Sequence, residues 1–380
     1  MAKLQNKTRL LFVTILILVF LFTSCKFVSL QKSDQLSEIT TFLSPSYGLN
    51  LTEISDENVK GIFSDRESKQ IFNSISSLSA SDLLNVHIIG KFGKSADDLQ
   101  SGTYFVMKPE ETFLGYMLLV NTLKYNHDFG IVAAVDYQPV MININGETKL
   151  LPTFGMKTNT IKGYAFELPP LEPGLHTLTL SLIIEPDYHF VFKADEFIAK
   201  DNEAAMFRNS PMEMSVLIWV TDDIPTGVED WPEQTKSIFP KNTSSINAIV
   251  ALREKAESGK PALMFQSEDT VTRGETVTYY LNFVAPILGK GPFDTILVVL
   301  WDDQYFQTQR LTFDAAKIQS DKFFPINFTV PDQLEKGDHT LTIIAYPYPY
   351  YLHWWEDGQE WHPNITYFSY ITARLPVKIQ

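Results

Sequence analysis

The chain has a single cysteine and few basic residues. Because Cys25 is the only cysteine among 380 residues, no disulfide can form within the chain and its stability must come from packing. Lys and Arg number 31 against 45 Asp and Glu, which gives a net charge of -14. Nucleic-acid binding needs clustered Lys and Arg to contact phosphates. The composition therefore argues against a nucleic-acid partner.

Common catalytic motifs are also missing. The sequence contains no Gly-x-Ser-x-Gly, phosphate-binding loop, His-Glu-x-x-His, paired cysteines or Gly-x-Gly-x-x-Gly. We therefore expect no cofactor and no enzymatic activity. A Ser-His-Asp site assembled from distant residues stays open, because such a site needs no motif.

The first 25 residues have the pattern of an export signal. Lys3, Lys7 and Arg9 precede an apolar run from Leu10 to Phe22. The run has 13 residues, within the range of about 7–15 for a signal and short of the roughly 20 that span a bilayer. A short retained membrane anchor is the alternative interpretation.

The end of this run carries a more specific signal. The residues Phe-Thr-Ser-Cys at 22–25 resemble the lipobox of bacterial lipoproteins. The resemblance implies that residues 1–24 are a signal peptide and that Cys25 receives a diacylglycerol. Two acyl chains hold a protein stably on a membrane. We therefore expect a lipid-anchored protein on the extracytoplasmic side of the cell membrane, with the net charge lowered by three to -17.

Residues 25–80 are expected to form a tether. Their first half is rich in Ser and Thr, which favours a flexible spacer. Ser64 and Glu67 have the spacing of a capping box, and apolar residues follow at helical intervals. We predict a short amphipathic helix near 65–78.

Short apolar or alternating runs in the rest of the chain predict mostly strands, in two domains over 81–222 and 262–380. Asn145-Gly146 lies between two alternating runs, which is a strong signal for a tight hairpin. Prolines mark 223–261 as a linker, and the apolar spacing within it predicts a helix over 244–258.

The two strand-rich halves resemble each other. A turn, Gly-x-His and the alternation Thr-Leu-Thr occur at Gly174 and again at Gly337, 163 residues later. The halves are similar to bacterial immunoglobulin-like domains. The expected fold is mainly β, with two immunoglobulin-like antiparallel sandwiches joined by a short helical linker. Thr177 and Thr179 should then point away from the first core. We interpret the recurring His176 and His339 as structural corner residues that bond to backbone.

One segment is unusually aromatic. Ten Tyr, Trp and Phe residues lie between Tyr346 and Tyr370, in a loop between the last two strands. Exposed rings can stack on sugars or hold a peptide. The candidate binding residues are Tyr350, Tyr351, Trp354, Trp355 and Trp361. The alternative is that these rings pack between the domains.

These observations favour a binding or structural module of the cell envelope. Its expected partners are the lipid bilayer, through acylated Cys25, and a glycan or a protein at the aromatic loop. The alternative is an envelope enzyme, or an enzyme accessory, that acts on polysaccharide.

Overall fold

A computed structural model describes the backbone of a large part of the chain. The described residues are 37–40, 48–64, 86–100, 104–123, 125–186, 212–235, 249–255, 260–261, 269–283, 292–302, 305–314, 323–347, 353–357, 360–364 and 370–380. The predicted signal segment with Cys25 and the predicted helix near 65–78 lie outside them.

The described residues are mainly β-strand, as the sequence predicted. We call the strands β2 to β12 the first unit: β2 (Gly48–Ile54), β3 (Val86–Gly93), β4 (Tyr104–Met107), β5 (Leu114–Asn121), β6 (His127–Val135), β7 (Gln138–Ile144), β8 (Glu147–Lys149), β9 (Thr153–Met156), β10 (Thr160–Glu167), β11 (Gly174–Ile184) and β12 (Met212–Val220). It also carries the helix α2 (Asp56–Ile62). Two short 3-10 helices, η1 (Val228–Asp230) and η2 (Glu233–Thr235), follow it.

The second unit begins after these helices and also takes in β1 (Ser37–Thr40). Its other strands are β13 (Ile249–Lys255), β14 (Lys260–Pro261), β15 (Asp269–Val271), β16 (Thr276–Phe283), β17 (Pro292–Trp301), β18 (Tyr305–Asp314), β19 (Phe323–Thr329), β20 (Gly337–Pro347) and β23 (Tyr370–Ile379). A separate hairpin of β21 (His353–Asp357) and β22 (Glu360–Asn364) lies between β20 and β23 in sequence.

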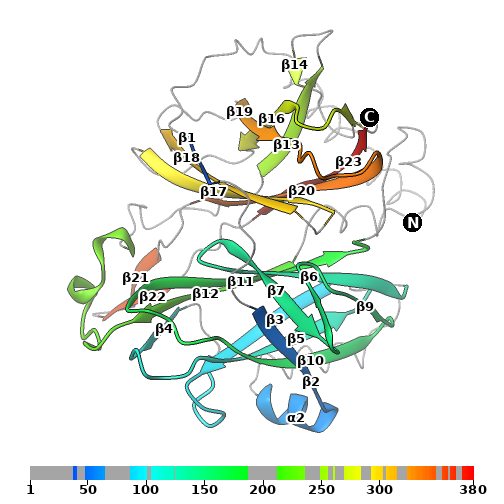
Figure 1. Ribbon diagram of the computed structural model, residues 1–380. Helices are drawn as coiled ribbons and strands as arrows, with labels where there is room; N and C mark the ends of the chain where they lie inside the picture. The colour runs from blue at the N-terminus through cyan, green and yellow to red at the C-terminus, as the bar shows by residue number, and fades with distance from the viewer. Residues whose placement is uncertain are drawn as a thin grey trace, which may run out of the picture.

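The same strand order occurs in both units. In the first unit β3-β5-β10 form one part of the sheet and β7-β6-β11-β12-β4 the other, with β2 joining the two parts. In the second unit the corresponding orders are β13-β16-β19 and β18-β17-β20-β23-β15. Both five-strand orders end in a parallel pair, β12 with β4 and β23 with β15. This agreement supports the internal repeat that the sequence predicted, and Figure 1 shows the two units stacked on each other.

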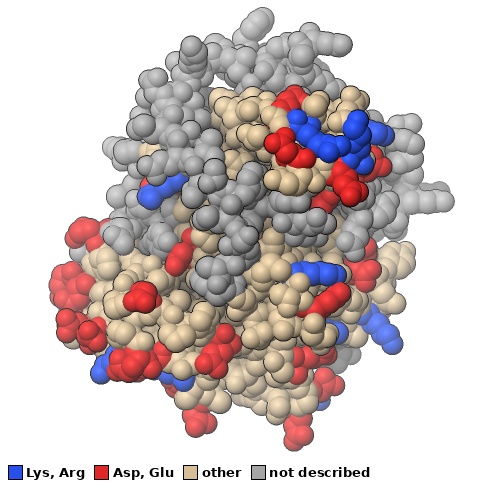
Figure 2. Space-filling view, in the orientation of Figure 1, with Lys and Arg blue, Asp and Glu red and all other residues tan. Residues whose placement is uncertain are grey.

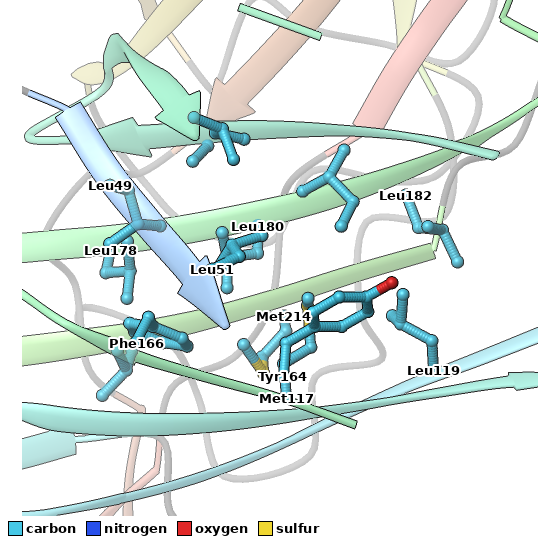
Figure 3. Packing of buried hydrophobic residues seen from close by; sticks show 14 of the residues in the cluster. Leu49, Leu51, Met117, Leu119, Tyr164, Phe166, Leu178, Leu180, Leu182 and Met214 are labelled. Carbon is cyan, nitrogen blue, oxygen red and sulfur yellow. The ribbon is translucent and has the colours of Figure 1, made fainter. Parts of the chain in front are cut away.

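Strand alternation builds the core of the first unit. In β11, Leu178, Leu180 and Leu182 are buried and point to the same face. Figure 3 shows them packed with Met214 and other residues from both parts of the sheet. Each fully buried Leu stabilises the fold by about 1.5–3 kcal/mol relative to an exposed one.

Two turns confirm local sequence predictions. Asn145 and Gly146 have positive φ angles of 55° and 84° between β7 and β8, as a tight hairpin requires. Helix α2, which the sequence analysis missed, begins after Ser55, whose hydroxyl accepts a hydrogen bond from the Asn58 N–H at 3.3 Å. The helix covers the outer face of β5, where Val59 packs near Leu118.

The two units meet through apolar side chains on their outer sheet faces. Ile296, Val298 and Leu300 of β17 pack with Ile344 and Tyr346 of β20 against the first unit. The first unit contributes Val132, Tyr137, Leu150, Leu151 and Ile183. Its Thr177 and Thr179 do point away from the first core, yet both are buried, and the hydroxyl groups of Thr179 and Tyr346 lie 3.4 Å apart. The second unit therefore covers a face that the sequence predicted as outward.

The helix predicted over 244–258 is wrong in the described part of that range. Ile249–Lys255 is strand β13, which pairs with β16. The spacing of Ile249 and Val250 fits a helix face. Both residues are β-branched, however, and strand β16 offers an edge with which they pair. Tertiary pairing therefore outweighs local periodicity here.

The tether predicted over 25–80 is wrong where the structure describes strands and helix α2. Residues 37–40 form β1 beside β18, and β2 pairs with both β10 and β7. Leu49 and Leu51 alternate with polar residues in β2 and enter the core. Their burial outweighs the polar composition of the surrounding segment.

We expect the substitution Ile344→Ala to destabilise the protein by about 2–5 kcal/mol, because Ile344 is fully buried between the units. Urea unfolding measures this change. Ile224→Ala is the matched control, since Ile224 is 61% exposed and its truncation should change the free energy of unfolding by less than about 0.5 kcal/mol. Equal effects of the two substitutions would contradict a packed contact between the units.

Candidate functional site

The predicted aromatic loop contains a two-stranded hairpin. Trp354 and Trp355 lie in β21 and Trp361 lies in β22. The register places Trp355 opposite His362 and Trp361 opposite Glu356. The structure does not describe the side chains of this hairpin, and Tyr350 and Tyr351 lie outside the described residues.

This hairpin extends from the second unit to the end of the first. Strand β22 contacts η1, which follows β12. Figure 1 shows β21 and β22 beside the β12 side of the first unit, away from the sheet that contains β20 and β23. The aromatic hairpin therefore lies next to the segment 221–235 that leaves the first unit.

Segment 221–235 carries an aromatic cluster of its own. The ring of Trp231 lies 5.0 Å from that of Trp219 on β12 and 5.4 Å from that of Tyr104 on β4, centroid to centroid. Trp231 is buried, whereas Trp219 and Tyr104 are half-buried. Leu217 completes the cluster beneath Trp231. We call these rings together with the hairpin β21–β22 the tryptophan surface.

Local hydrogen bonds hold Trp231 in place. The Asp230 carboxylate accepts bonds from the Thr226 N–H at 2.8 Å, the Thr226 hydroxyl at 2.9 Å and the Gly227 N–H at 3.2 Å. Thr235 closes the next turn by donating its hydroxyl to the Pro232 carbonyl at 2.7 Å. The cluster thus rests on an ordered turn and on the outer face of β12 and β4.

Acidic residues are frequent in the segment that carries Trp231. Exposed acids in this segment are Asp222, Asp223, Glu229, Asp230 and Glu233, and no Lys or Arg occurs from 209 to 235. The sequence from 337 to 373, which contains the hairpin, also has no Lys or Arg. Figure 2 shows acidic side chains gathered over the side of the first unit where η1 and η2 lie. Half-buried rings beside carboxylates can stack on a sugar face and accept hydrogen bonds from its hydroxyl groups.

Sequence reasoning found the aromatic segment but expected a loop instead of the hairpin β21–β22, and it missed Tyr104, Trp219 and Trp231. Trp219 looked like an ordinary strand residue, and Trp231 lay in a predicted linker. A signal was nevertheless present, because five of the six tryptophans occur in two segments of the chain, 219–231 and 354–361. Only contact between the segments, such as that of β22 with η1, could show that they belong together.

The two recurring histidines hold equivalent turns. His176 Nδ1 lies 2.8 Å from Asp136 Oδ2, and its Nε2 lies 2.7 Å from the Glu172 carbonyl oxygen. The other oxygen of Asp136 accepts a bond from the Thr177 N–H at 3.0 Å. In the second unit His339 Nδ1 bonds to Asp302, and Nε2 lies 2.8 Å from the Glu335 carbonyl oxygen. We call each arrangement an Asp–His clamp.

The clamps are structural, as the sequence analysis predicted for both histidines. Asp136 and Asp302 have positive φ angles of 51° and 45°, which are costly for residues other than glycine. His176 faces a carboxylate and a carbonyl oxygen, which accept hydrogen bonds, so its protonated ring can donate from both nitrogens. Hydrogen bonding to Asp136 raises the pKa of His176, with a further contribution from the Glu172 carbonyl, although burial opposes the shift.

Two further points concern metal-binding groups and membrane-spanning helices among the described residues. Among the side chains that the structure describes, no three His, Cys, Asp or Glu residues are grouped so as to hold a metal ion. In the same part of the chain, no helix has the length and apolar character needed to span a bilayer.

Comparisons with known proteins give no family. No family model matches the chain, and no curated protein is similar to it in sequence. Among solved structures, a CARDB domain from Pyrococcus furiosus, solved in complex with di-metal ions, matches 38% of this chain and 97% of its own length, with 8% identity and a TM-score of 0.22.

Two larger proteins also match. Dimeric latent PorU from Porphyromonas gingivalis matches 80% of this chain and 21% of its own, with 11% identity and a TM-score of 0.19. Red sea bream transglutaminase matches 83% of this chain and 34% of its own, with 8% identity and a TM-score of 0.19. This chain thus spans about a fifth of the first protein and about a third of the second. TM-scores of this size carry no argument about function.

We expect His176 to stabilise the fold most at low pH. Because its pKa is raised in the folded state, its contribution is complete below the ordinary pKa of about 6.5 and is lost as the pH rises through the folded pKa. The free energy of unfolding, measured by urea titration between pH 6 and pH 9, should therefore fall more in the wild-type protein than in His176→Gln. Parallel pH profiles would show that the ring is not protonated in the clamp.

Proposed function

We propose that this protein is a lipid-anchored binding module on the extracytoplasmic side of the cell membrane. Its body would consist of two immunoglobulin-like β-sandwiches, and acylated Cys25 would hold it on the bilayer. The repeated strand order supports the two sandwiches. The lipobox-like residues 22–25 support the anchor.

We assign ligand binding to the tryptophan surface. The observation that carries this assignment is the meeting of aromatic segments from the two units, where β22 contacts η1 beside the rings of Trp219 and Trp231. A site formed by both units also gives a reason for their fixed contact. Large rings held by packing lose little conformational freedom when they bind a ligand, which favours affinity.

A cell-envelope glycan fits this surface best. The half-buried rings of Trp219 and Tyr104 can bind the apolar faces of sugar rings, and carboxylates of the same segment can accept bonds from sugar hydroxyl groups. An extended peptide held by the same rings is the second candidate, because Trp and Tyr also dominate protein contacts. Its support is the acidic border of Asp222, Asp223 and Glu229, which would attract basic side chains. We propose no catalytic step at this surface.

The Trp219→Ala substitution should weaken glycan binding about tenfold or more, because one stacked aromatic ring contributes on the order of 1–3 kcal/mol to a sugar- or base-sized ligand. Binding of the mature chain to purified cell-wall glycans, measured by calorimetry, tests this. Tyr125→Ala is the matched control, since Tyr125 is a 48% exposed aromatic residue distant in sequence from the tryptophan surface.

Far-ultraviolet circular dichroism and urea unfolding of Trp219→Ala separate loss of binding from loss of fold. Unchanged glycan affinity in a folded Trp219→Ala variant would contradict the assignment. Binding of basic peptides but of no glycan would favour the second candidate.

The Cys25→Ser substitution should release the protein from membranes, because the thiol that accepts the lipid is gone and the acidic chain has little attraction for anionic lipid. Fractionation of cells into membrane and soluble parts measures the release. Ser24→Ala, which keeps a small residue beside the cysteine, is the control and should stay in the membrane fraction. Persistent membrane association of Cys25→Ser would contradict acylation as the anchor.

A further inference from the structure

We propose that the outer edge of β18 is a strand-acceptor site, at which an extended segment of a partner protein replaces β1. The partner segment would carry hydroxyl or amide side chains opposite Gln307 and Gln309. This site is separate from the tryptophan surface and does not depend on the proposed lipid anchor.

Among the described strands, β1 covers only part of the edge of β18. Strand β1 lies at the end of its sheet and pairs with Thr308–Leu311, whereas β18 extends over ten residues from Tyr305 to Asp314. Along this edge, no described strand pairs with residues 305–307 or 312–314. Backbone groups on such an edge readily pair with an added strand.

The equivalent edge of the first unit is covered differently. There β2 pairs with β7 and β10 and buries Leu49 and Leu51 in the core. The sequence of β1 is Ser-Glu-Ile-Thr, with Ile39 as its single apolar residue. Core packing thus fixes β2 in the first unit, whereas β1 pairs with a single strand along four residues.

Two buried side chains beside β1 need a partner. Gln307 and Gln309 are each 3% exposed, and among the described residues their Oε1 atoms have no hydrogen-bond partner. Gln309 lies opposite Leu297 of β17, so it faces the interior of the second unit. Leaving a buried polar atom unpaired costs free energy that a ligand can recover.

The register explains why β1 does not satisfy Gln309. Ile39 lies directly opposite it, and directly opposed residues in antiparallel strands share one face with Cβ atoms about 4.5–5.5 Å apart. Isoleucine can neither donate nor accept a hydrogen bond. Asn, Ser or Thr at this position can do both, so such a residue would suit either orientation of the glutamine amide.

The acceptor strand itself is firmly held. Strand β18 pairs with β17 along all ten of its residues. On its opposite face, the Thr308 hydroxyl donates to Gln138 Oε1 of the first unit at 3.3 Å. Departure of β1 would therefore leave β18 in place as a preformed edge.

The partner's chemistry follows from the residues of β18. Arg310 is exposed, pairs with Asp294 of β17 and lies opposite Glu38, so a second acidic residue at the position of Glu38 complements its charge. In the partner segment, the residue after this acid would lie opposite Gln309. The residue two positions later would lie opposite Gln307. The expected segment is extended and antiparallel to β18, with the order acid, hydroxyl or amide, any residue, hydroxyl or amide.

A labelled peptide tests this site. The probe is a synthetic copy of residues 33–44 with Ile39→Asn, and the control peptide carries Ile39→Leu. The receptor is the mature chain with Cys25→Ser, Glu38→Cys and Arg310→Cys, in which oxidation locks β1 on β18 because the two positions are directly opposed. Fluorescence anisotropy measures binding to the reduced and the oxidised receptor.

We expect the Asn peptide to bind the reduced receptor about tenfold more tightly than the Leu peptide, since a buried polar group gains its partner. Oxidation should abolish the binding of both peptides. Equal affinity of the two peptides, or equal binding to the oxidised receptor, would overturn the proposal. So would failure of the two cysteines to cross-link, because that would contradict the register of β1.

Light scattering of the reduced receptor without peptide measures its oligomeric state and provides an independent test. A monomer at all concentrations agrees with a site for a different protein. Concentration-dependent dimers that disappear on oxidation would show that a second copy supplies its own β1, and the assignment to a partner protein would be wrong.

Discussion

The structure depends on the apolar contact between the outer sheet faces of its two units. Strands β11, β17 and β20 are each buried on both faces, one by their own core and one by the other unit. Interfaces between domains of one chain are commonly polar and permit relative motion. Here Val298, Leu300 and Ile344 are almost fully buried, so their separation would expose apolar surface. The two units are therefore expected to behave as one body, as the proposed binding site between them would require.

The repeat explains why some parts of the molecule resemble each other and others differ. Both units keep an Asp–His clamp where a tight turn forces an aspartate into positive φ. In each turn the aspartate carboxylate bonds to a histidine of the adjacent strand. This histidine is His176 in β11 and His339 in β20. The sheet edges carry no such constraint, so β2 became part of the first core while β1 lies at an edge of the second unit.

Much of the fold could be predicted from local patterns. Period-two alternation located the runs around Leu178 and Leu341, and Asn145-Gly146 located a hairpin. The failures had one physical origin, which is pairing between distant segments. Residues 249–255 have a helical spacing and became a strand beside β16, and residues 48–54 have a polar composition and joined a sheet. The free energy gained when a segment pairs with a sheet edge cannot be read from a short stretch of sequence. Trp219 and Trp231 were missed for the same reason, because only the folded chain brings them near the hairpin.

The two N-terminal strands also set how far the proposed anchor can hold the body from a membrane. If residues 25–80 were all coil, their root-mean-square reach would be about 40 Å and their extended reach several times greater. Because β1 begins at Ser37, only the eleven residues 26–36 separate it from Cys25, and even fully extended they span no more than about 40 Å. The β18 edge would then stay close to the lipid surface as long as β1 is paired with it. A linker this short suits a module that works within the envelope next to its membrane. It does not suit a module that must reach far beyond that membrane.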